Sequence, residues 1–244
     1  MARLPSIIVY DLDGTLVDTG PNIAMAVNRT RRHYGLPDTA VETVVSYVGD
    51  GAGKLVERSL FGQTNPGDRD PGPVLGAGPD DPSEEAVFAT FMRLYSDDPV
   101  DQCRVDEGVM DALQHWHERG VTQAVLTNKP HPLAVAVLGA FDMSPYMAMT
   151  IGRGETLDGT TIPTKPNPMG LHHILDSLEV DRSRAWMVGD GQADLGVARA
   201  AGVNALILLN GFCSPERYAA MDDPPEHAFM SFREADAFLR EWAG

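Results

Sequence analysis

The amino-acid sequence predicts an α/β protein: a doubly wound parallel sheet with an all-α segment inserted after its first strand. An apolar, partly β-branched run at residues 7–10 is typical of a short buried strand. From about residue 103, helical and strand patterns alternate, as they do in proteins built from βα units. Residues 18–100 show only helix and loop patterns. We therefore expect a core domain of residues 1–17 and 101–244 and a helical domain of residues 18–100.

Four helical segments make up the predicted insertion. Gly35 ends the first, and Ser83 is positioned to cap the last. Residues 62–82 are rich in glycine and proline, which neither a helix nor a central strand accommodates, so we expect a long surface loop there. The four segments are residues 21–34, 39–47, 55–60 and 84–95.

A glycine-rich turn at residues 49–53 precedes the third of these segments. Its backbone amides, with Lys54 and Arg58 nearby, would suit an anion. The spacing does not fit a P-loop, which needs Ser or Thr where the chain has Leu55. A helix-start turn without a ligand is the alternative.

Helices and strands alternate in the second half of the chain. Gly120, for example, ends one helix just before a strand begins. This order predicts a parallel sheet, and ligands of open α/β folds bind at the carboxyl ends of such strands. The predicted helices are residues 108–119, 132–139, 167–178 and 193–201, and the strands are residues 122–126, 148–151, 185–188 and 204–209.

Two aspartates follow the carboxyl end of the first strand. Asp11 and Asp13 are two residues apart, and Gly14 after them allows a sharp turn. One carboxylate can attack phosphorus while the other moves a proton, and Mg²⁺ would hold the first ionised. An Asp-x-Asp-Gly turn without catalytic function is the alternative on these residues alone.

Polar residues also follow later strands. Thr127 and Asn128 suit phosphate oxygens, although a simple Thr-Asn turn is the alternative. Lys165 is flanked by prolines, which favours a held ammonium, although an exposed lysine at a helix start explains it equally. Asp190 and Asp194 lie one helical turn apart and can face one cation, although acids also stabilise a helix N-terminus. Together these groups are what phosphoryl transfer requires: a nucleophile, a proton shuttle, cationic groups and a metal site.

The composition restricts the partners. The formal net charge is −16, which argues against nucleic acid and acidic membrane surfaces because the field of the whole molecule repels polyanions. Cys103 and Cys213 are too few for a disulfide framework, and we expect a cytoplasmic protein with reduced thiols. No stretch predicts a signal peptide or a membrane span. A small anionic substrate is not excluded, because it senses the local charges of its site first.

In order and spacing, these motifs resemble those of the haloacid dehalogenase (HAD) superfamily. Residues 11–19 resemble its first motif, Thr127 the second, Lys165 the third and residues 189–194 the fourth. The insertion, particularly residues 47–58, resembles the helical cap of the phosphoglycolate phosphatase-like branch. The resemblance implies a Rossmann-like core with an inserted all-α cap domain that closes over the site.

By this resemblance, Asp11 is the nucleophile and Asp13 the general acid and base. Mg²⁺ would be bound by the Asp11 carboxylate, the Asp13 backbone carbonyl and Asp190, with Asp194 in support. Lys165 would steady Asp11 and the transferring group. The acid at position 13 favours phosphate over halogen chemistry. The residues expected to contact phosphate or substrate are Gly14, Lys54, Arg58, Thr127, Asn128 and Lys165.

The resemblance implies a Mg²⁺-dependent phosphatase that acts on a small phosphorylated metabolite, with 2-phosphoglycolate the first expectation and a monomer or homodimer as the assembly. A sugar-phosphate phosphatase or phosphomutase is the alternative within the superfamily. A non-catalytic protein that binds a phosphorylated ligand is the alternative outside it. Two departures from the family pattern are the length of the loop at residues 62–82 and Gly191, where a small hydroxyl residue is common.

Overall fold

The computed structural model describes residues 4–65, 68–76, 78, 80–157, 159–209, 218 and 223–244. The chain divides into two compact units. The first unit comprises Met1–Asp18 and Arg104–Gly244, and the second comprises Thr19–Cys103. The boundaries expected from the sequence, after residues 17 and 100, lie one and three residues before the observed ones.

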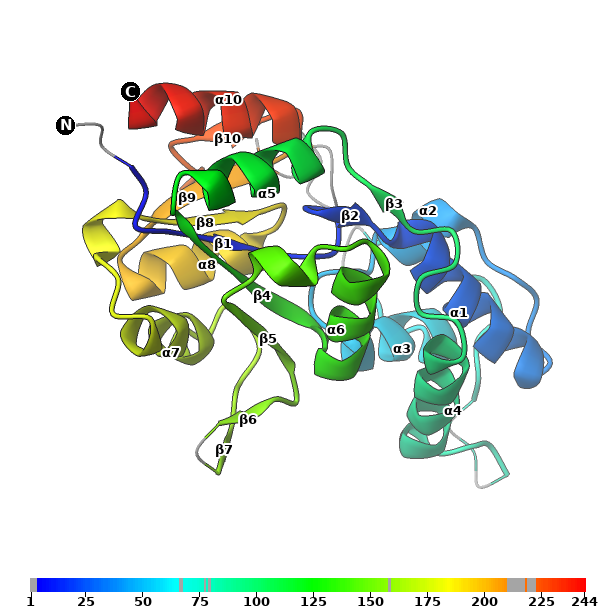
Figure 1. Cartoon of the computed structure of the whole chain (residues 1–244). Coiled ribbons are helices and arrows are strands. Elements are labelled where there is room, and N and C mark those ends of the chain that lie inside the picture. The colour runs from blue at the N-terminus through cyan, green and yellow to red at the C-terminus, as the bar shows by residue number, and fades with distance from the viewer. Residues whose placement is uncertain are drawn as a thin grey trace. The chain divides into compact units, whose positions relative to one another are not determined.

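A six-stranded sheet forms the centre of the first unit (Figure 1). All of its neighbouring strands pair in parallel, which confirms the predicted fold class. In the order β10-β9-β8-β1-β4-β5, the strands are Ala228–Phe229, Asn204–Leu208, Ala185–Gly189, Ile7–Tyr10, Thr122–Pro130 and Met149–Arg153.

The side of the sheet on which successive strands are added changes at β1. The chain first adds β4 and β5 on one side of β1 and then returns to add β8, β9 and β10 on the other. In register, Tyr10 at the end of β1 lies opposite Val125 of β4 and Val188 of β8. The residues that follow these three strands therefore meet at the switch point of the sheet, where doubly wound folds bind their ligands.

Helices cover both faces of the sheet. On one face, α7 (Met169–Ser177) and α8 (Gln192–Ala201) pack over a core that includes Ile7 and Val9. On the other, α5 (Val109–Glu118) and α10 (Phe232–Ala243) lie over Tyr10, while α6 (His131–Ala140) packs on β4 and β5 (Figure 1). Alternate residues of β1 thus face opposite layers, which explains why all four are buried and apolar.

The first unit also contains short elements that the sequence patterns did not predict. β2 (Val17–Asp18) pairs antiparallel with β3 (Arg104–Val105), at the two points where the chain leaves and re-enters this unit. β6 (Thr156–Leu157) and β7 (Thr160–Thr161) form a small antiparallel pair. Among the described residues of this unit there are also two 3-10 turns, η1 (Ser144–Tyr146) and η2 (Arg182–Arg184). β10 and α10 were also not predicted.

In its described residues, the second unit is entirely helical and loop. Its helices are α1 (Gly20–His33), α2 (Val41–Val45), α3 (Ala52–Phe61) and α4 (Glu84–Ser96). As expected, Ser83 caps α4 by accepting a hydrogen bond from Ala86 N, and the described part of residues 62–82 contains neither helix nor strand. The buried Arg31 donates to the carbonyls of Ser59 and Pro73, which ties this loop to the helices. None of the helices described in either unit combines the length and apolar character needed to cross a membrane.

Candidate active site

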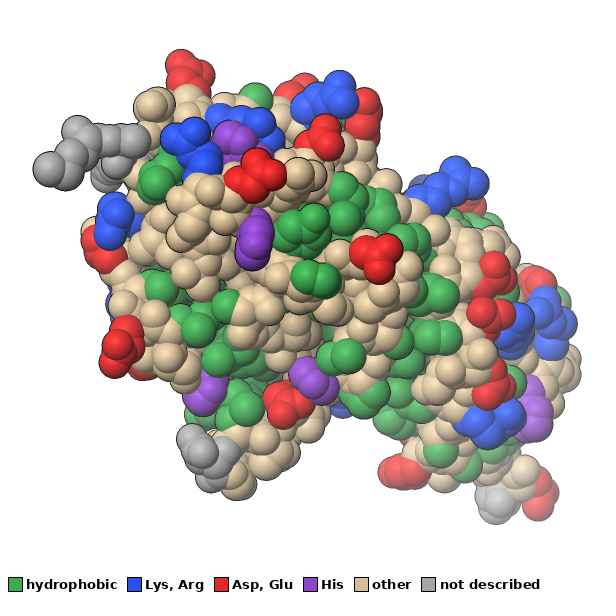
Figure 2. All heavy atoms as spheres, viewed as in Figure 1, with side chains coloured by type: hydrophobic (Ala, Val, Ile, Leu, Met, Phe, Trp, Pro, Cys, Tyr) green, Lys and Arg blue, Asp and Glu red, His purple; other side chains and the backbone are tan. Residues whose placement is uncertain are grey.

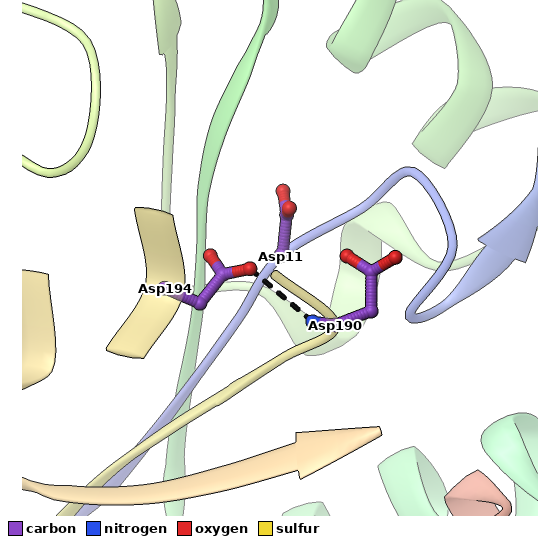
Figure 3. Close-up of side chains that lie close together, drawn as sticks. All are labelled: Asp11, Asp190 and Asp194. Carbon is purple, nitrogen blue, oxygen red and sulfur yellow. Dashed lines mark hydrogen bonds between the residues drawn. The ribbon is translucent and has the colours of Figure 1, made fainter. Parts of the chain in front are cut away.

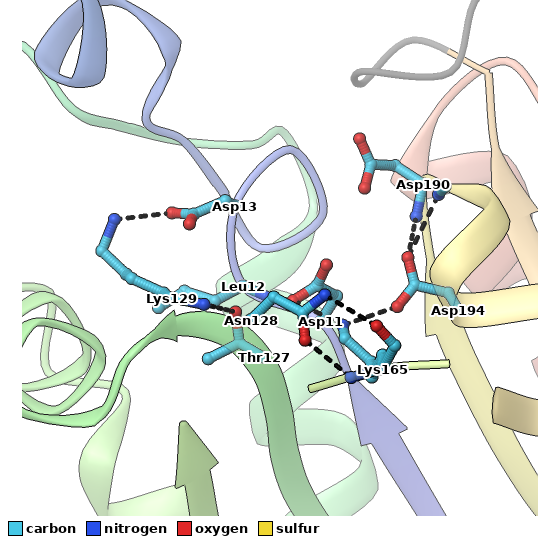
Figure 4. Close-up of polar contacts among 10 residues, drawn as sticks. Asp11, Leu12, Asp13, Thr127, Asn128, Lys129, Lys165, Asp190 and Asp194 are labelled. Carbon is cyan, nitrogen blue, oxygen red and sulfur yellow. Dashed lines mark hydrogen bonds and ion pairs between the residues drawn. The ribbon is translucent and has the colours of Figure 1, made fainter. Parts of the chain in front are cut away.

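The carboxyl ends of β1, β4 and β8 and one loop bring most of the predicted site residues together (Figure 4). β1 ends just before Asp11, β8 ends just before Asp190, and the loop before α7 supplies Lys165. After Asp13, Gly14 adopts a left-handed φ of 78° and turns the chain, as expected. The predicted residues that gather here are Asp11, Asp13, Thr127, Asn128, Lys165, Asp190 and Asp194.

Asp11 is held in one orientation by its own loop and by a lysine. Its Oδ1 accepts a hydrogen bond from the Leu12 amide at 2.7 Å and lies 2.9 Å from Lys165 Nζ. Burial raises the pKa of Asp11 to about 6, with two neighbouring aspartates adding to the effect and Lys165 opposing it. A cation at this carboxylate would favour the ionised form, which is the form that a nucleophile requires.

Lys165 Nζ lies between two carboxylates. It is 2.9 Å from Asp11 Oδ1 and 2.6 Å from Asp194 Oδ1, and only 1% of its side chain is exposed. Burial lowers the pKa of Lys165, but the two carboxylates outweigh it and raise the pKa above its ordinary value. The ammonium therefore stays charged and fixes the position of Asp11 relative to Asp194.

Asp194 joins the start of α8 to the end of β8. Its Oδ2 accepts hydrogen bonds from the amides of Asp190 at 3.2 Å and Gly191 at 3.1 Å. A carboxylate is favourable at this helix N-terminus because the first amides of a helix have no partner within it. A Cβ at Gly189 would lie 2.2 Å from Asp194 Cγ, so Asp194 can occupy this position only because residue 189 lacks a side chain.

Three carboxylates form a candidate metal site (Figure 3). Each of Asp11, Asp190 and Asp194 contributes an oxygen, and the three oxygens lie within 4.8 Å of one another. Asp190 and Asp194 are 3% and 2% exposed, and the single ammonium of Lys165 does not balance three buried acids. The site therefore fits a hard divalent cation such as Mg²⁺, which prefers carboxylate oxygens.

The side-chain amide of Asn128 is hydrogen-bonded to the loop that carries Lys165. Its Oδ1 accepts a hydrogen bond from Lys165 N at 2.8 Å, and its Nδ2 donates to Lys165 O at 3.1 Å. The amide thus fastens the lysine loop to β4, which is a structural role that the sequence did not predict. Thr127 Oγ1 accepts a hydrogen bond from Lys129 N at 3.2 Å. The expected phosphate contacts of Thr127 and Asn128 stay predictions.

Lys129 belongs to this cluster, although sequence reasoning did not include it. Its Nζ lies 2.8 Å from Asp13 Oδ1, and 1% of its side chain is exposed. The sequence held two signals for it: Lys129 directly follows the predicted phosphate-binding pair, and the chain has only three lysines. Figure 4 shows the Lys129–Asp13 pair on the opposite side of Asp11 from Lys165.

Two predicted substrate contacts lie in the second unit. Lys54 pairs with Glu57 on the surface of α3. The guanidinium of Arg58 donates to the Tyr47 carbonyl and to Asp50, so it closes the glycine-rich turn onto α3. Their expected contact with a bound anion stays a prediction.

The fold and the acid–lysine centre define a class of hydrolase. The family model of haloacid dehalogenase-like hydrolases matches residues 5–202. The chain therefore belongs to the haloacid dehalogenase-like hydrolase family. Within it, the chain falls in the phosphoglycolate phosphatase-like branch, as the relatives below show. The predicted superfamily and branch are thus confirmed, as is the predicted enzyme class, a phosphoric monoester hydrolase.

The relatives are enzymes named for one substrate. The chain is 34% identical to phosphoglycolate phosphatase 1 of Pseudomonas aeruginosa over 211 aligned residues. The alignment covers 86% of this chain and 71% of that protein. It is also 34% identical over 211 residues to phosphoglycolate phosphatase of Rhodospirillum rubrum, covering 86% of this chain and 81% of that protein. A crystal structure of a predicted phosphoglycolate phosphatase from Haemophilus somnus has the same fold, with a TM-score of 0.79, 24% identity and 99% of both chains covered.

Proposed function

We propose that this chain is a Mg²⁺-dependent phosphatase that hydrolyses a small phosphate monoester through an aspartyl-phosphate on Asp11. The observation that carries the proposal is the buried cluster of Asp11, Asp190 and Asp194, with Lys165 bridging Asp11 and Asp194. The cluster supplies an oriented nucleophile, a cation site and a fixed ammonium at the switch point of the sheet, which is the set of groups that phosphoryl transfer needs.

In the first step, an oxygen of Asp11 attacks phosphorus. A bond forms between that oxygen and phosphorus while the bond from phosphorus to the leaving oxygen breaks, and its electron pair goes to the leaving oxygen. Asp13, two residues further on, gives its proton to that oxygen, so that a neutral alcohol leaves. Lys165 keeps Asp11 aligned and provides positive charge beside the transferring group.

In the second step, water attacks the phosphorus of the aspartyl-phosphate. Asp13, now ionised, accepts the proton from the water, and the bond between phosphorus and the Asp11 oxygen breaks to return the carboxylate. Asp11, Asp190 and Asp194 would hold the metal, with the Asp13 carbonyl as a further ligand by family resemblance. When bound, Mg²⁺ would neutralise part of the negative charge of the phosphate.

The proposed substrate is 2-phosphoglycolate, because the similar relatives are phosphoglycolate phosphatases. The second unit is proposed to act as the cap that selects it. A screen of small phosphate esters separates this proposal from a sugar-phosphate phosphatase or phosphomutase, and preference for sugar phosphates would overturn the substrate assignment. The cytoplasmic location and the monomeric or dimeric state stay predictions.

Asp11→Asn tests the proposed nucleophile. We expect phosphatase activity with Mg²⁺ to fall by at least about a thousandfold, because loss of the attacking group removes the covalent route. Unfolding temperature measures whether the fold is intact. Asp176→Asn is the matched control, because Asp176 is an exposed aspartate of the same unit that pairs only with surface Arg182 among the contacts described. Substantial activity in Asp11→Asn would refute the assignment.

Beryllium fluoride with Mg²⁺ distinguishes an enzyme from a non-catalytic phosphate-binding protein. The fluoride complex mimics a phosphoryl group on an aspartate, so the wild-type chain should unfold at a higher temperature in its presence, since a ligand that binds only the folded state stabilises it. Asp11→Asn should show no such rise. An unchanged wild-type unfolding temperature, together with no turnover, would favour the binding protein.

A further inference from the structure

The site contains a second buried lysine that the proposed steps have not used. Lys129 Nζ lies 2.8 Å from Asp13 Oδ1, and the two side chains are 1% and 13% exposed. Lys165 makes the equivalent contact with Asp11 at 2.9 Å, with the same exposures. Each aspartate of the first loop therefore has a lysine of its own, on a chain whose other basic residues are almost all arginine.

The backbone of β4 is irregular where it carries Lys129. Leu126 pairs with Ile151 and Pro130 pairs with Arg153, so four steps along β4 match only two along β5. In a regular strand, successive side chains point to opposite faces. A bulge changes that alternation and can re-aim a side chain, and bulges are frequent beside active sites. Here the irregular stretch allows Thr127, Asn128 and Lys129 all to be buried near the carboxyl end of β1.

We infer that Lys129 is a positioning residue that fixes the Asp13 carboxylate where it can hand its proton to the leaving oxygen. The inference rests on the proposed function, because Asp13 has this task only in a phosphatase. The ammonium contacts Oδ1 of Asp13 and so restricts the torsion of that side chain. In the step concerned, the bond from phosphorus to the leaving oxygen breaks, that oxygen takes the electron pair, and the proton passes from Asp13 to it.

Direct binding of substrate is the competing role for Lys129. The charged end of Lys129 is already within hydrogen-bond distance of Asp13, and its side chain is almost fully buried. Lys165 is buried to the same degree, so burial alone does not decide between the two roles; what distinguishes Lys129 is that its ammonium contacts the proton-transferring Asp13 and not the nucleophile. The geometry therefore favours an action of Lys129 through Asp13. The two roles, positioning of Asp13 and direct binding of substrate, can be separated because they predict that variants of Lys129 lose activity on different substrates.

The test compares leaving groups. Wild type, Lys129→Met and Lys129→Arg are assayed with Mg²⁺ on 2-phosphoglycolate, ethyl phosphate and p-nitrophenyl phosphate. The first two release aliphatic alcohols, which must be protonated as they leave, whereas p-nitrophenolate leaves without a proton. We expect Lys129→Met to lose about 100-fold in kcat/KM on both alkyl esters, as is typical when general acid catalysis fails, and less than about threefold on the aryl ester. The comparison uses kcat/KM because this constant covers only the steps up to departure of the alcohol, whereas kcat also includes the second step, in which Asp13 takes a proton from water whatever the leaving group was.

The conservative variant and a control separate positioning from general damage. Lys129→Arg keeps the positive charge and should recover at least about tenfold of the loss on alkyl esters, because the guanidinium can still contact Asp13. Arg240→Met is the matched control. It removes the ion-pair partner of Asp236, an aspartate with 11% exposure that also accepts a hydrogen bond from Trp116 Nε1. Both residues of the pair lie on α10, a helix that contributes no described residue to the site. It should affect all substrates equally and slightly. Thermal unfolding of each variant accompanies the assays.

Each other outcome overturns the inference. Equal losses in kcat/KM on alkyl and aryl esters would mean general damage to the site. A rise in KM confined to 2-phosphoglycolate would make Lys129 a contact of the substrate carboxylate. Full activity in Lys129→Met would show that Asp13 does not need the lysine. Absence of activity in the wild type on all three esters would instead overturn the proposed function, and the inference with it.

Discussion

Asp106 is a half-buried carboxyl group outside the site, next to the β2–β3 pair. Burial and, to a lesser degree, the charge of Asp18 raise the pKa of Asp106 to about 6. In the unfolded chain the carboxyl titrates near its ordinary value of about 4. Between these two pH values the folded state binds more protons than the unfolded state, so stability falls as pH rises through this window.

Asp106→Asn should therefore stabilise the protein at neutral and alkaline pH. We expect the free energy of unfolding to rise by about 1 kcal/mol at pH 8, a figure reduced to allow for solvent screening of a partly exposed group. The gain should disappear below about pH 4, where the wild-type carboxyl is protonated in both states. Urea unfolding from about pH 4 to 8 measures it.

Glu107→Gln is the neighbouring control for this prediction. Glu107 forms a surface ion pair with Arg233 and is 79% exposed. Its neutralisation should change stability by less than about 0.5 kcal/mol at any of these pH values. A lower free energy of unfolding for Asp106→Asn at pH 8 would show that Asp106 contributes a favourable interaction as a carboxylate.

At the residue scale, the sequence identified the loops of the site better than the contacts within them. Parallel strands end at the same edge, so Asp11 and Asp190 were predicted to meet, and they do. The pairing of Asn128 with the backbone of Lys165 depends on two loops far apart in sequence. The approach of Lys129 to Asp13 depends on the bulge in β4. Neither long-range contact leaves a periodic pattern that one sequence can reveal.

The junction of β8 and α8 is the element on which the acid cluster depends most. Gly189 ends β8, and the side chain of Asp194 fills the space beside it. Gly189→Ala should displace Asp194, which would free the Asp190 and Gly191 amides and remove one carboxylate from Lys165. We expect a loss of about 100-fold in kcat/KM and a destabilisation of about 1–3 kcal/mol from overpacking.

Mg²⁺-dependent unfolding gives a readout of this element apart from activity. The wild type should unfold at a higher temperature as Mg²⁺ is added, and Gly189→Ala should show little of that rise. Gly139→Ala is the control, because Gly139 lies within α6 and a Cβ there meets no atom within 4 Å. It should be neutral or slightly stabilising. A normal Mg²⁺ response in Gly189→Ala would show that the cluster tolerates the added methyl group.

At the scale of elements, long periodic segments were predicted well and short or terminal ones were not. The predicted helix at residues 193–201 matches α8 to within one residue. The two-residue strands β2 and β3 are too short to show alternation. α10 was omitted, although Ser231 and Glu234 have the spacing of a helix start, and Ser231 Oγ accepts a hydrogen bond from Glu234 N. β4 continues to Pro130, four residues beyond the prediction, because its irregular end still pairs with β5.

At the scale of the whole molecule, the chain carries a net negative charge, although its site must attract an anion. The formal net charge is −16, and on the face drawn in Figure 2 acidic side chains are scattered among basic ones. The site itself places two buried ammonium groups, Lys129 and Lys165, beside its carboxylates. A substrate therefore meets repulsion at long range and cationic groups only at short range, and salt screens the first interaction more than the second.

The activity should therefore increase with ionic strength at low salt. The distance over which charges act falls from about 30 Å at 0.01 M salt to about 10 Å at 0.1 M. Over this range, at fixed Mg²⁺ and pH, we expect kcat/KM for 2-phosphoglycolate to rise about twofold with kcat unchanged, because encounter with the substrate is affected and the enclosed chemistry is not. Tetramethylammonium chloride is the control salt, since its bulky cation cannot enter an oxygen-lined metal site. A steady fall of kcat/KM in both salts would contradict this prediction. It would mean that attraction of the substrate by the two lysines outweighs its repulsion by the net charge of the protein.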